Sequence, residues 1–329
     1  MTKKSARCDV ALLVDEETGE YGRDGRFIPE DDDVEEKVLR ALRKRYRRVD
    51  VVPFSPRVAE TVAWLRRLKP RIVMNLTEWV DGDRKQDAAI AGLLDILKLR
   101  YTGAGPAGLR LARDKSLAKR VVSGFGVSVP QQLKLINKNN EISYPLLVKP
   151  QFGDGSEGIA RQSLVRNARE LRARVQSIRA RLKEPVLCEE FIPGRDLYVG
   201  LLGNAPRVLP PVELVVRSRS RSAPQFATYR LKNDPRYRAK WRVHYRRARL
   251  DGRTMRMVEE ASRRIFHALE LRDYARLDFR LTHDNRLYFI EANPNPDLDP
   301  YALNRNGCFA GVPYVRLIST IVESARRRG

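Results

Sequence analysis

Two carboxylates and an amide near the end of the chain carry the strongest chemical signal in the sequence. Residues 275–294 alternate as two apolar strands joined by a polar turn, which predicts a hairpin. Same-face side chains recur every second residue, so Glu291 and Asn293 share a face that Asp278 can oppose. Hard oxygen ligands on a rigid sheet suit Mg²⁺ bound together with substrate phosphates. Arg276 shares the face of Asp278 and can hold a phosphate or an oxyanion. The pattern favours an ATP-using enzyme, and the alternative is a solvated strand end before a proline turn.

Length and charge limit the possible functions without choosing one. A chain of 329 residues is long enough for two or three domains. The net charge of +23 attracts polyanions such as ATP, acidic peptides or nucleic acid, although GC-rich coding that favours Arg explains it equally well. The three cysteines are far apart and form no disulfide or zinc pattern, which fits a reducing cytoplasm. No signal peptide or membrane span is visible, so we expect a cytoplasmic protein without a membrane partner.

The order of apolar segments predicts an α/β fold. Strands and helices alternate over the first hundred residues, which indicates a doubly wound domain with a parallel sheet. Glycines at 103 and 105 mark its end. Beyond them we expect helices over 109–123, 167–183 and 256–271, strands over 146–150 and 186–192, and a final helix from residue 312.

A glycine-rich loop and a pair of adjacent acids fit nucleotide binding. Lys149 ends an apolar strand, and the glycines of loop 152–158 let backbone N–H groups approach a phosphate. The loop is not a Walker A motif, and glycine-rich hairpin loops are common. Glu189 and Glu190 must point to opposite faces of their strand, so one can meet adenine while the other faces water. Asp196 can accept hydrogen bonds from ribose hydroxyls. A solvated strand end is the alternative for these acids.

Taken in order, these motifs resemble the ATP-grasp superfamily and, within it, the D-alanine–D-alanine ligase family. The resemblance covers roughly residues 70–300 and rests on YTGAG at 101–105, DK at 114–115, LVKP at 147–150, GSEGI at 155–159, EEFIPG at 189–194, RLD at 276–278 and IEAN at 290–293. It implies an ATP-grasp fold in which two sheets clamp ATP behind an N-terminal, doubly wound pre-ATP-grasp domain. We expect the N-terminal domain over 1–104, the central subdomain over 105–185 and the C-terminal subdomain over 186–329.

The resemblance also implies how ATP would be held. Lys115 and Lys149 would contact its phosphates, and Ser156 in the glycine-rich loop would cover the triphosphate. Asp196 would hold the ribose. The adenine hinge would consist of Glu189, Glu190, Phe191 and Ile192.

The remaining implied roles concern the reaction. Asp278, Glu291 and Asn293 would bind one or two Mg²⁺ ions, for which Mn²⁺ can substitute. Lys232 matches a mobile-loop lysine that reaches the γ-phosphate, and Arg276 would stabilise an oxyanion. The family reaction joins a carboxylate to an amine through an acyl phosphate, which depends on positioning and charge neutralisation.

Departures from the family pattern gather on the amino-acid side. Gly155 stands where the loop has a serine, and Asn233 where a tyrosine follows the mobile-loop lysine. Asp297 lies where a glycine helps to form the oxyanion hole, and Ala302 lies near the serine that holds the acceptor carboxylate. We therefore expect an amino-acid or short-peptide substrate, with a product other than D-alanyl-D-alanine.

Residues 217–249 are strongly basic, with Tyr229, Tyr237, Trp241 and Tyr245 interleaved. The segment can be a solvated loop that meets only ATP, or it can bind an acidic or extended substrate. Bases alternating with aromatics also suit single-stranded nucleic acid, so a polyanion-binding protein with a vestigial ATP site is the alternative function. The predicted metal set favours the enzyme over a nucleic-acid partner. A homodimer is one assembly left open.

Overall fold

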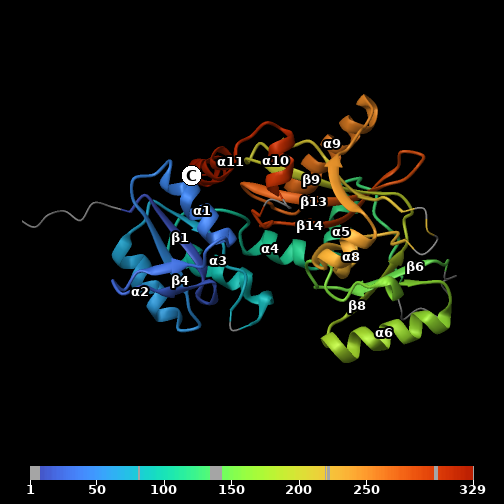
Figure 1. Cartoon of the computed structure of the whole chain (residues 1–329), viewed down its shortest axis with the longest axis horizontal. Helices are drawn as coiled ribbons and strands as arrows, with labels where there is room; N and C mark the ends of the chain where they lie inside the picture. The colour runs from blue at the N-terminus through green and yellow to red at the C-terminus, as the bar shows by residue number, and fades with distance from the viewer. Residues whose placement is uncertain are drawn as a thin grey trace, which may run out of the picture.

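The computed structural model describes residues 8–80, 82–133, 143–218, 220, 223–299 and 303–328. Arg219 and Arg221 of the basic segment, and Ala302, lie outside these residues. The chain forms an N-terminal lobe and an elongated second lobe in which two sheets face each other (Figure 1). No helix within the described ranges is long and apolar enough to span a membrane.

The N-terminal sheet is parallel and has helices on both faces, as predicted. β1 (Val10–Asp15) lies between β4 (Val49–Phe54) and β5 (Ile72–Asn75). The odd-numbered and even-numbered residues of β1 enter different cores, because successive side chains point to opposite faces. α1 (Val34–Arg43) and α11 (Tyr314–Arg327) cover the first face, and α2 (Val58–Leu68) and α3 (Asp87–Ile96) cover the second.

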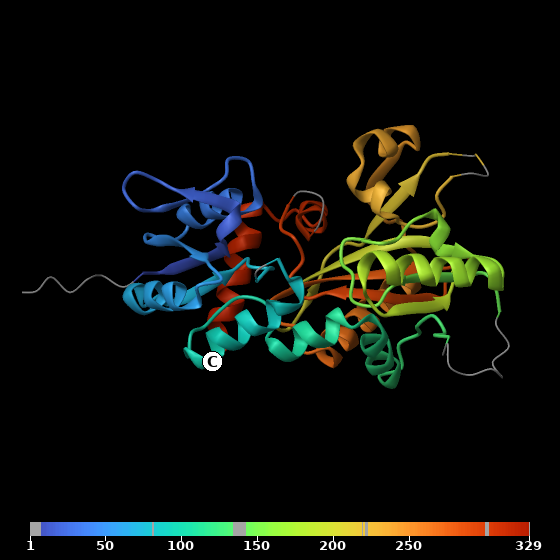
Figure 2. The same cartoon turned by 90° about the horizontal axis from the view of Figure 1, so that it is seen from below.

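The last helix belongs spatially to the first lobe. Leu317, Ile318 and Ile321 of α11 are fully buried against α1 and the N-terminal sheet. In Figure 2 the red C-terminal helix stands against the blue strands. The predicted domain boundaries at residues 104 and 185 remain a proposal. α11 belongs to the predicted C-terminal subdomain in sequence, but it packs on the N-terminal sheet.

The central subdomain is a small antiparallel sheet with one covering helix. β6 (Leu146–Pro150) lies between β7 (Leu164–Val165) and β8 (Val186–Glu190). α6 (Ala168–Leu182) begins after Asn167, whose side chain accepts a hydrogen bond from the Glu170 N–H at 2.9 Å. The predicted core positions 171, 175, 178 and 182 do pack on this sheet.

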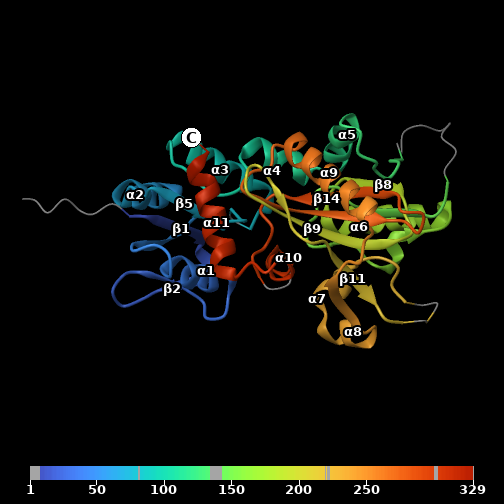
Figure 3. The same ribbon diagram turned by 90° about the horizontal axis from the view of Figure 1, so that it is seen from above.

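The second lobe is built on a six-stranded sheet. Its order is β12 (Val243–Arg247), β11 (Val212–Val216), β9 (Arg195–Leu202), β13 (Tyr274–Leu281) and β14 (Leu287–Asn293), with β10 (Arg207–Val208) paired to β9. α9 (Gly252–Ala268) covers one face together with α4 (Pro106–Arg113) and α5 (Lys115–Gly124). Figure 3 shows these helices along one side of the sheet and α7 (Tyr229–Asn233) with α8 (Pro235–Lys240) on the other.

The single helix expected over 109–123 was wrong, because the chain breaks at Asp114. This residue is extended, and its carboxylate caps α5 by accepting hydrogen bonds from the Ser116 and Leu117 N–H groups, both at 3.0 Å. The break turns Lys115 and α5 toward the second lobe. The remaining short elements are η1 (Glu16–Thr18), β2 (Gly19–Tyr21), β3 (Phe27–Pro29), η2 (Arg84–Gln86), η3 (Arg161–Ser163) and α10 (Leu303–Phe309).

Candidate active site

Two adjoining pockets bring together every residue that the sequence predicts for the site. The smaller, of about 70 Å³, lies between β8 and the β13–β14 hairpin. The larger, of about 1220 Å³, opens between the N-terminal lobe, the glycine-rich loop and α7. Glu291 and Lys232 line both pockets, so they mark the junction. The smaller pocket is also lined by Lys149, Ser156, Glu189, Glu190, Phe191, Ile192, Asp196 and Asp278, and the larger by Lys115, Arg276 and Asn293.

The β13–β14 hairpin has the register that the sequence predicts. Asp278 pairs with Glu291 and Arg276 with Asn293, with a β-bulge directly after Asp278. The Asn293 Nδ2 atom lies 3.5 Å from Asp278 Oδ1, so the amide and the carboxylate share one face. Two carboxylates and an amide present the oxygen donors that a hard divalent cation needs.

Arg276 is an ion-pair partner of that face. Its Nε and Nη2 atoms lie 2.8 and 3.2 Å from the two oxygens of Asp278. This contact outweighs the burial of the guanidinium and raises the pKa of Arg276. Each carboxylate oxygen keeps a further lone pair, so Asp278 can still accept a cation. Within the described residues, the hairpin included, no group of three or more histidines, cysteines and acids is placed to hold a metal, and the hairpin offers two acids and an amide instead.

Glu291 is held ionised by lysines. Burial opposes its charge, but Lys115, Lys232 and Lys149 outweigh burial and lower the pKa of Glu291 to about 2. Lys115 forms an ion pair with this carboxylate, with its Nζ atom 3.7 Å from Glu291 Oε2. The three cations arrive from α5, α7 and β6, so separate parts of the fold converge on one carboxylate.

Glu189 lies between two lysines and lines the smaller pocket. Its side chain is 1% exposed, and its two oxygens lie 2.7 Å from the Nζ atoms of Lys119 and Lys149. The neighbouring Glu190 faces solvent, as strand alternation requires. The prediction that one of the two acids points inward is therefore confirmed. Each oxygen of the inward carboxylate, that of Glu189, is paired with one lysine. Lys119 was missed, although its position one turn after Lys115 places it on the same helix face.

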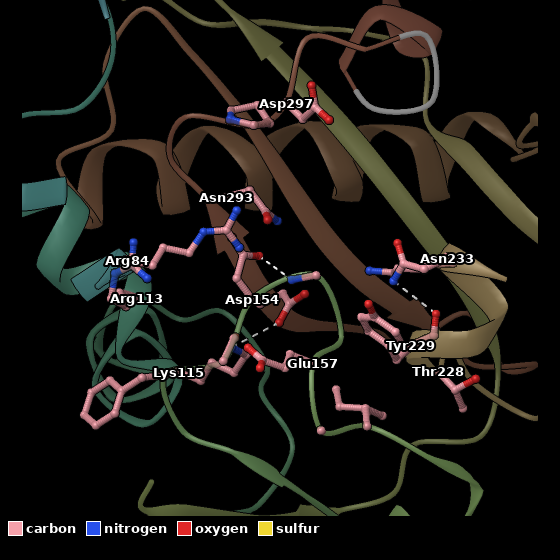
Figure 4. Close-up of a pocket in the computed structure, with 18 of the residues that line it drawn as sticks. Arg84, Arg113, Lys115, Asp154, Glu157, Thr228, Tyr229, Asn233, Asn293 and Asp297 are labelled. Atoms are coloured by element: carbon pink, nitrogen blue, oxygen red, sulfur yellow. Dashed lines mark hydrogen bonds and ion pairs between the residues drawn. The ribbon is translucent and has the colours of Figure 1, made fainter. Parts of the chain in front are cut away.

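The glycine-rich loop forms one wall of the larger pocket. Lys115 donates a hydrogen bond to the Gly153 carbonyl, and the Tyr229 N–H donates to the Ile159 carbonyl at 3.0 Å. The loop is therefore tied to α5 at one end and to α7 at the other. In Figure 4 its side chains Asp154 and Glu157 lie between Lys115 and Tyr229. Ser156, predicted to cover the phosphates, is 6% exposed.

The other end of the smaller pocket is held by an arginine that sequence reasoning missed. Arg280 contacts Asp196 at 2.9 Å, donates to the Ile192 carbonyl at 3.0 Å and lies 5.4 Å from the centre of the Phe191 ring. Its spacing two residues after Asp278 puts it on the same strand face and was the available signal. This one side chain fixes three of the residues predicted to hold adenosine.

Comparisons with known proteins decide the family. A model of the D-ala D-ala ligase C-terminus matches residues 127–323. A D-alanine–D-alanine ligase from Caulobacter vibrioides is 30% identical over 302 residues, which are 88% of this chain and 86% of that protein. This chain belongs to the D-alanine–D-alanine ligase family.

Solved structures support the same fold. The D-alanine–D-alanine ligase from Bacillus anthracis complexed with ATP superposes with a TM-score of 0.72 at 16% identity, over 98% of each chain. The VanG D-Ala:D-Ser ligase from Enterococcus faecalis gives a TM-score of 0.69 at 17% identity, over 97% of this chain and 100% of that one. The fold is the predicted ATP-grasp fold, and the protein is an ATP-dependent ligase that forms C–N bonds.

Two of the departures expected from the sequence, Asp297 and Asn233, line the larger pocket. Asp297 and Asp299 line one part of the pocket, and the Asp299 N–H donates to the Asp297 carboxylate at 2.8 Å. Near α7, Asn233 donates from its Nδ2 atom to the Tyr229 carbonyl at 3.1 Å. Two carboxylates therefore lie together in this part of the pocket.

The aromatic residues of the basic segment pack on its own cations. Arg230 lies 4.4 Å from the Tyr237 ring centre, and Lys240 lies 5.2 Å from that of Trp241. Trp241 is only 7% exposed and belongs to a small core with Tyr237. Packing inside α8 and β12 therefore accounts for Tyr237, Trp241 and Tyr245, whereas Tyr229 of α7 is 51% exposed beside the larger pocket.

Proposed function

We propose that this ligase joins a carboxylate to an amine through an acyl phosphate, with substrates other than a pair of D-alanines. The donor carboxylate attacks the γ-phosphorus of ATP and ADP leaves. The amine then attacks the acyl carbon, and phosphate leaves. The observation that carries the proposal is the convergence of Lys115, Lys149 and Lys232 on Glu291, opposite Asp278.

The nucleotide would extend across both pockets, with its adenosine toward the smaller pocket and its phosphates at the junction. Lys115 and Lys149 would neutralise phosphate charge, and Ser156 would cover it. Glu190, Phe191 and Ile192 line the end where adenine would bind, and Asp196 the place for ribose. Glu189 would act through its lysines.

The oxygen donors of the hairpin fit Mg²⁺, and Asp278, Glu291 and Asn293 would hold one or two ions, with Mn²⁺ as a substitute. The cation would supply charge neutralisation on the polyphosphate. Lys232 lines both pockets, so it would contact the γ-phosphate where the two substrates meet. Arg276 lines the larger pocket and would stabilise the oxyanion formed when the amine attacks.

The acceptor end supports a changed substrate. Asp297 and Asp299 would repel an acceptor that carries its own free carboxylate, and they would attract one with a second positive charge. The VanG enzyme is named for D-alanine and D-serine, so the fold itself does not fix the acceptor. The opposite wall is basic, with Arg161, Arg174 and Arg181 lining the larger pocket. An acidic amino acid or short peptide would therefore suit the carboxylate-donor position.

The proposal is tested by ADP release over a panel of carboxylate donors and amine acceptors, with mass spectrometry of the products. We expect acidic donors and acceptors without a carboxylate to give the highest rates, with a clear salt dependence. Preferential formation of D-alanyl-D-alanine would refute the changed substrate but not the ligase chemistry. Absence of ADP release with every pair, together with absence of ATP binding, would refute both.

We also propose a cytoplasmic location, where the free thiols of Cys8, Cys188 and Cys308 would stay reduced. A homodimer remains part of the proposal. The sedimentation behaviour of the purified chain would decide the assembly.

A further inference from the structure

Behind the phosphate-facing lysines lies another lysine that lines neither pocket. Lys119 on α5 is 0% exposed, and its Nζ atom is 2.7 Å from Glu189 Oε2. The other oxygen of Glu189 is 2.7 Å from Nζ of Lys149, which does line the smaller pocket. Lys119, Glu189 and Lys149 therefore form a buried chain across α5, β8 and β6. Two cations and one anion give the chain a net charge of +1.

Burying a charged amine of this kind lowers the stability of the fold, so its presence calls for a functional explanation. Removing a charge from water disfavours it, and one shared carboxylate compensates two ammonium groups only in part. A Met at this position would fill similar volume without the charge. The retained Lys119 therefore needs an explanation beyond packing.

We propose that Lys119 is a positioning residue for ATP binding, which holds Glu189 so that Lys149 is aimed at the phosphates and stays free to bind them. This inference rests on the proposed function. When Lys119 is charged, the single negative charge of Glu189 is shared by two ammonium groups. Lys149 is then only partly neutralised, and it can still attract the phosphates of ATP. With Lys119 absent or neutral, Glu189 pairs with Lys149 alone, and the net charge of the chain falls from +1 to zero.

The groups around Lys119 bring the pH at which it loses its proton close to neutral. Burial lowers the pKa of Lys119 to about 7 although Glu189 opposes this shift, and Lys149 adds to the lowering. Glu291 on β14 also faces the cluster and favours its cations. For Lys149, burial is outweighed by Glu189 and Glu291, so its pKa is raised and it stays charged. Lys119 is the member of the chain that loses its proton first.

The test measures ATP binding by calorimetry from pH 6 to 9 in the intact protein without amine substrate, beside steady-state kinetics. In Lys119→Met we expect the Kd and KM for ATP to rise at least about tenfold at pH 6, with a smaller change in kcat, since a unit charge several ångströms from a bound anion has that effect. In the unsubstituted protein, affinity should fall as pH rises through about 7. Lys119→Met should lack this transition, and Lys119→Arg should restore affinity at all pH values.

A double-mutant cycle separates positioning from mere packing. If Lys119 acts through Glu189, then Lys119→Met should add little to the effect of Glu189→Gln on ATP affinity. Lys44→Met, at an exposed position after α1, is the matched control and should change nothing. Additive effects in the cycle, or an unchanged pH dependence in Lys119→Met, would overturn the inference while leaving the ligase proposal intact. Failure of the unsubstituted protein to bind ATP would overturn both.

Discussion

Replacement of Glu291 by Gln tests the metal site and the lysine cluster together. Burial opposes ionisation of Glu291, but three lysines lower its pKa from the usual 4.5 to about 2. A pKa difference of this size corresponds to about 3 kcal/mol, at about 1.4 kcal/mol for each pH unit. The ionised carboxylate therefore stabilises the fold by about that amount relative to its neutral form. Glu291→Gln fixes the neutral form without changing the size of the side chain.

The pH dependence of this difference has a defined sign. A carboxylate with a lowered folded pKa stabilises the protein above its unfolded pKa, and the contribution is lost as pH falls through the folded pKa. Urea unfolding should therefore show Glu291→Gln about 3 kcal/mol less stable at pH 7. The gap should shrink between pH 4.5 and about 2. Turnover with Mg²⁺ should fall about 100-fold or more, because a charge that supports the transition state is lost.

Glu260→Gln on the exposed side of α9 is the matched control, and neither stability nor turnover should change. Full ADP release by Glu291→Gln would contradict the metal assignment. A stability difference that persists unchanged at low pH would refute the argument from the lysines.

Other predictions follow from the same site and from the core. Lys232→Met should lower kcat about 100-fold while changing the KM for ATP less, because the lysine would act on the γ-phosphate as charge moves; an unchanged kcat would exclude this role. Treatment with a chelator should abolish ADP release, and added Mg²⁺ should restore it; turnover that survives exhaustive chelation would argue against a metal at the hairpin. Ile178→Ala, at a side chain 2% exposed under the central sheet, should cost about 2–5 kcal/mol in urea unfolding. A loss below about 0.5 kcal/mol would mean that the cavity collapses or that the helix packs differently.

The hairpin was predictable because one geometric rule controls it. Period-two alternation places Arg276, Asp278 and Arg280 on one face of β13 and Leu277 and Phe279 on the other, and the structure buries the latter two in the core. The same rule required Glu189 and Glu190 to face opposite ways, and the structure shows that Glu189 is the one that points inward. The rule did not reveal what Glu189 would meet, because its partners come from two elements distant in sequence.

Long-range packing and backbone breaks were outside the reach of pattern reasoning. The apolar face of α11 shows that the helix is buried, but not that its partner is α1, which lies almost the whole chain away. The break at Asp114 was hidden because apolar residues continue at helical spacing on both sides. Aromatic residues interleaved with lysines and arginines are compatible with a nucleic-acid-binding surface and with internal cation–π packing. The sequence does not distinguish these two arrangements, and the contacts in the folded chain do.

The place of α11 has a consequence for how the protein is made. β1, β4 and β5 are synthesised before α11, but one face of their sheet is completed only when Leu317, Ile318 and Ile321 pack on it. Until those residues emerge, only α1 covers this face, and the apolar surface that α11 buries stays exposed. The ATP-grasp portion is synthesised in between, so it can fold first. The enzyme's N-terminal lobe would then be the last part to reach its final packing.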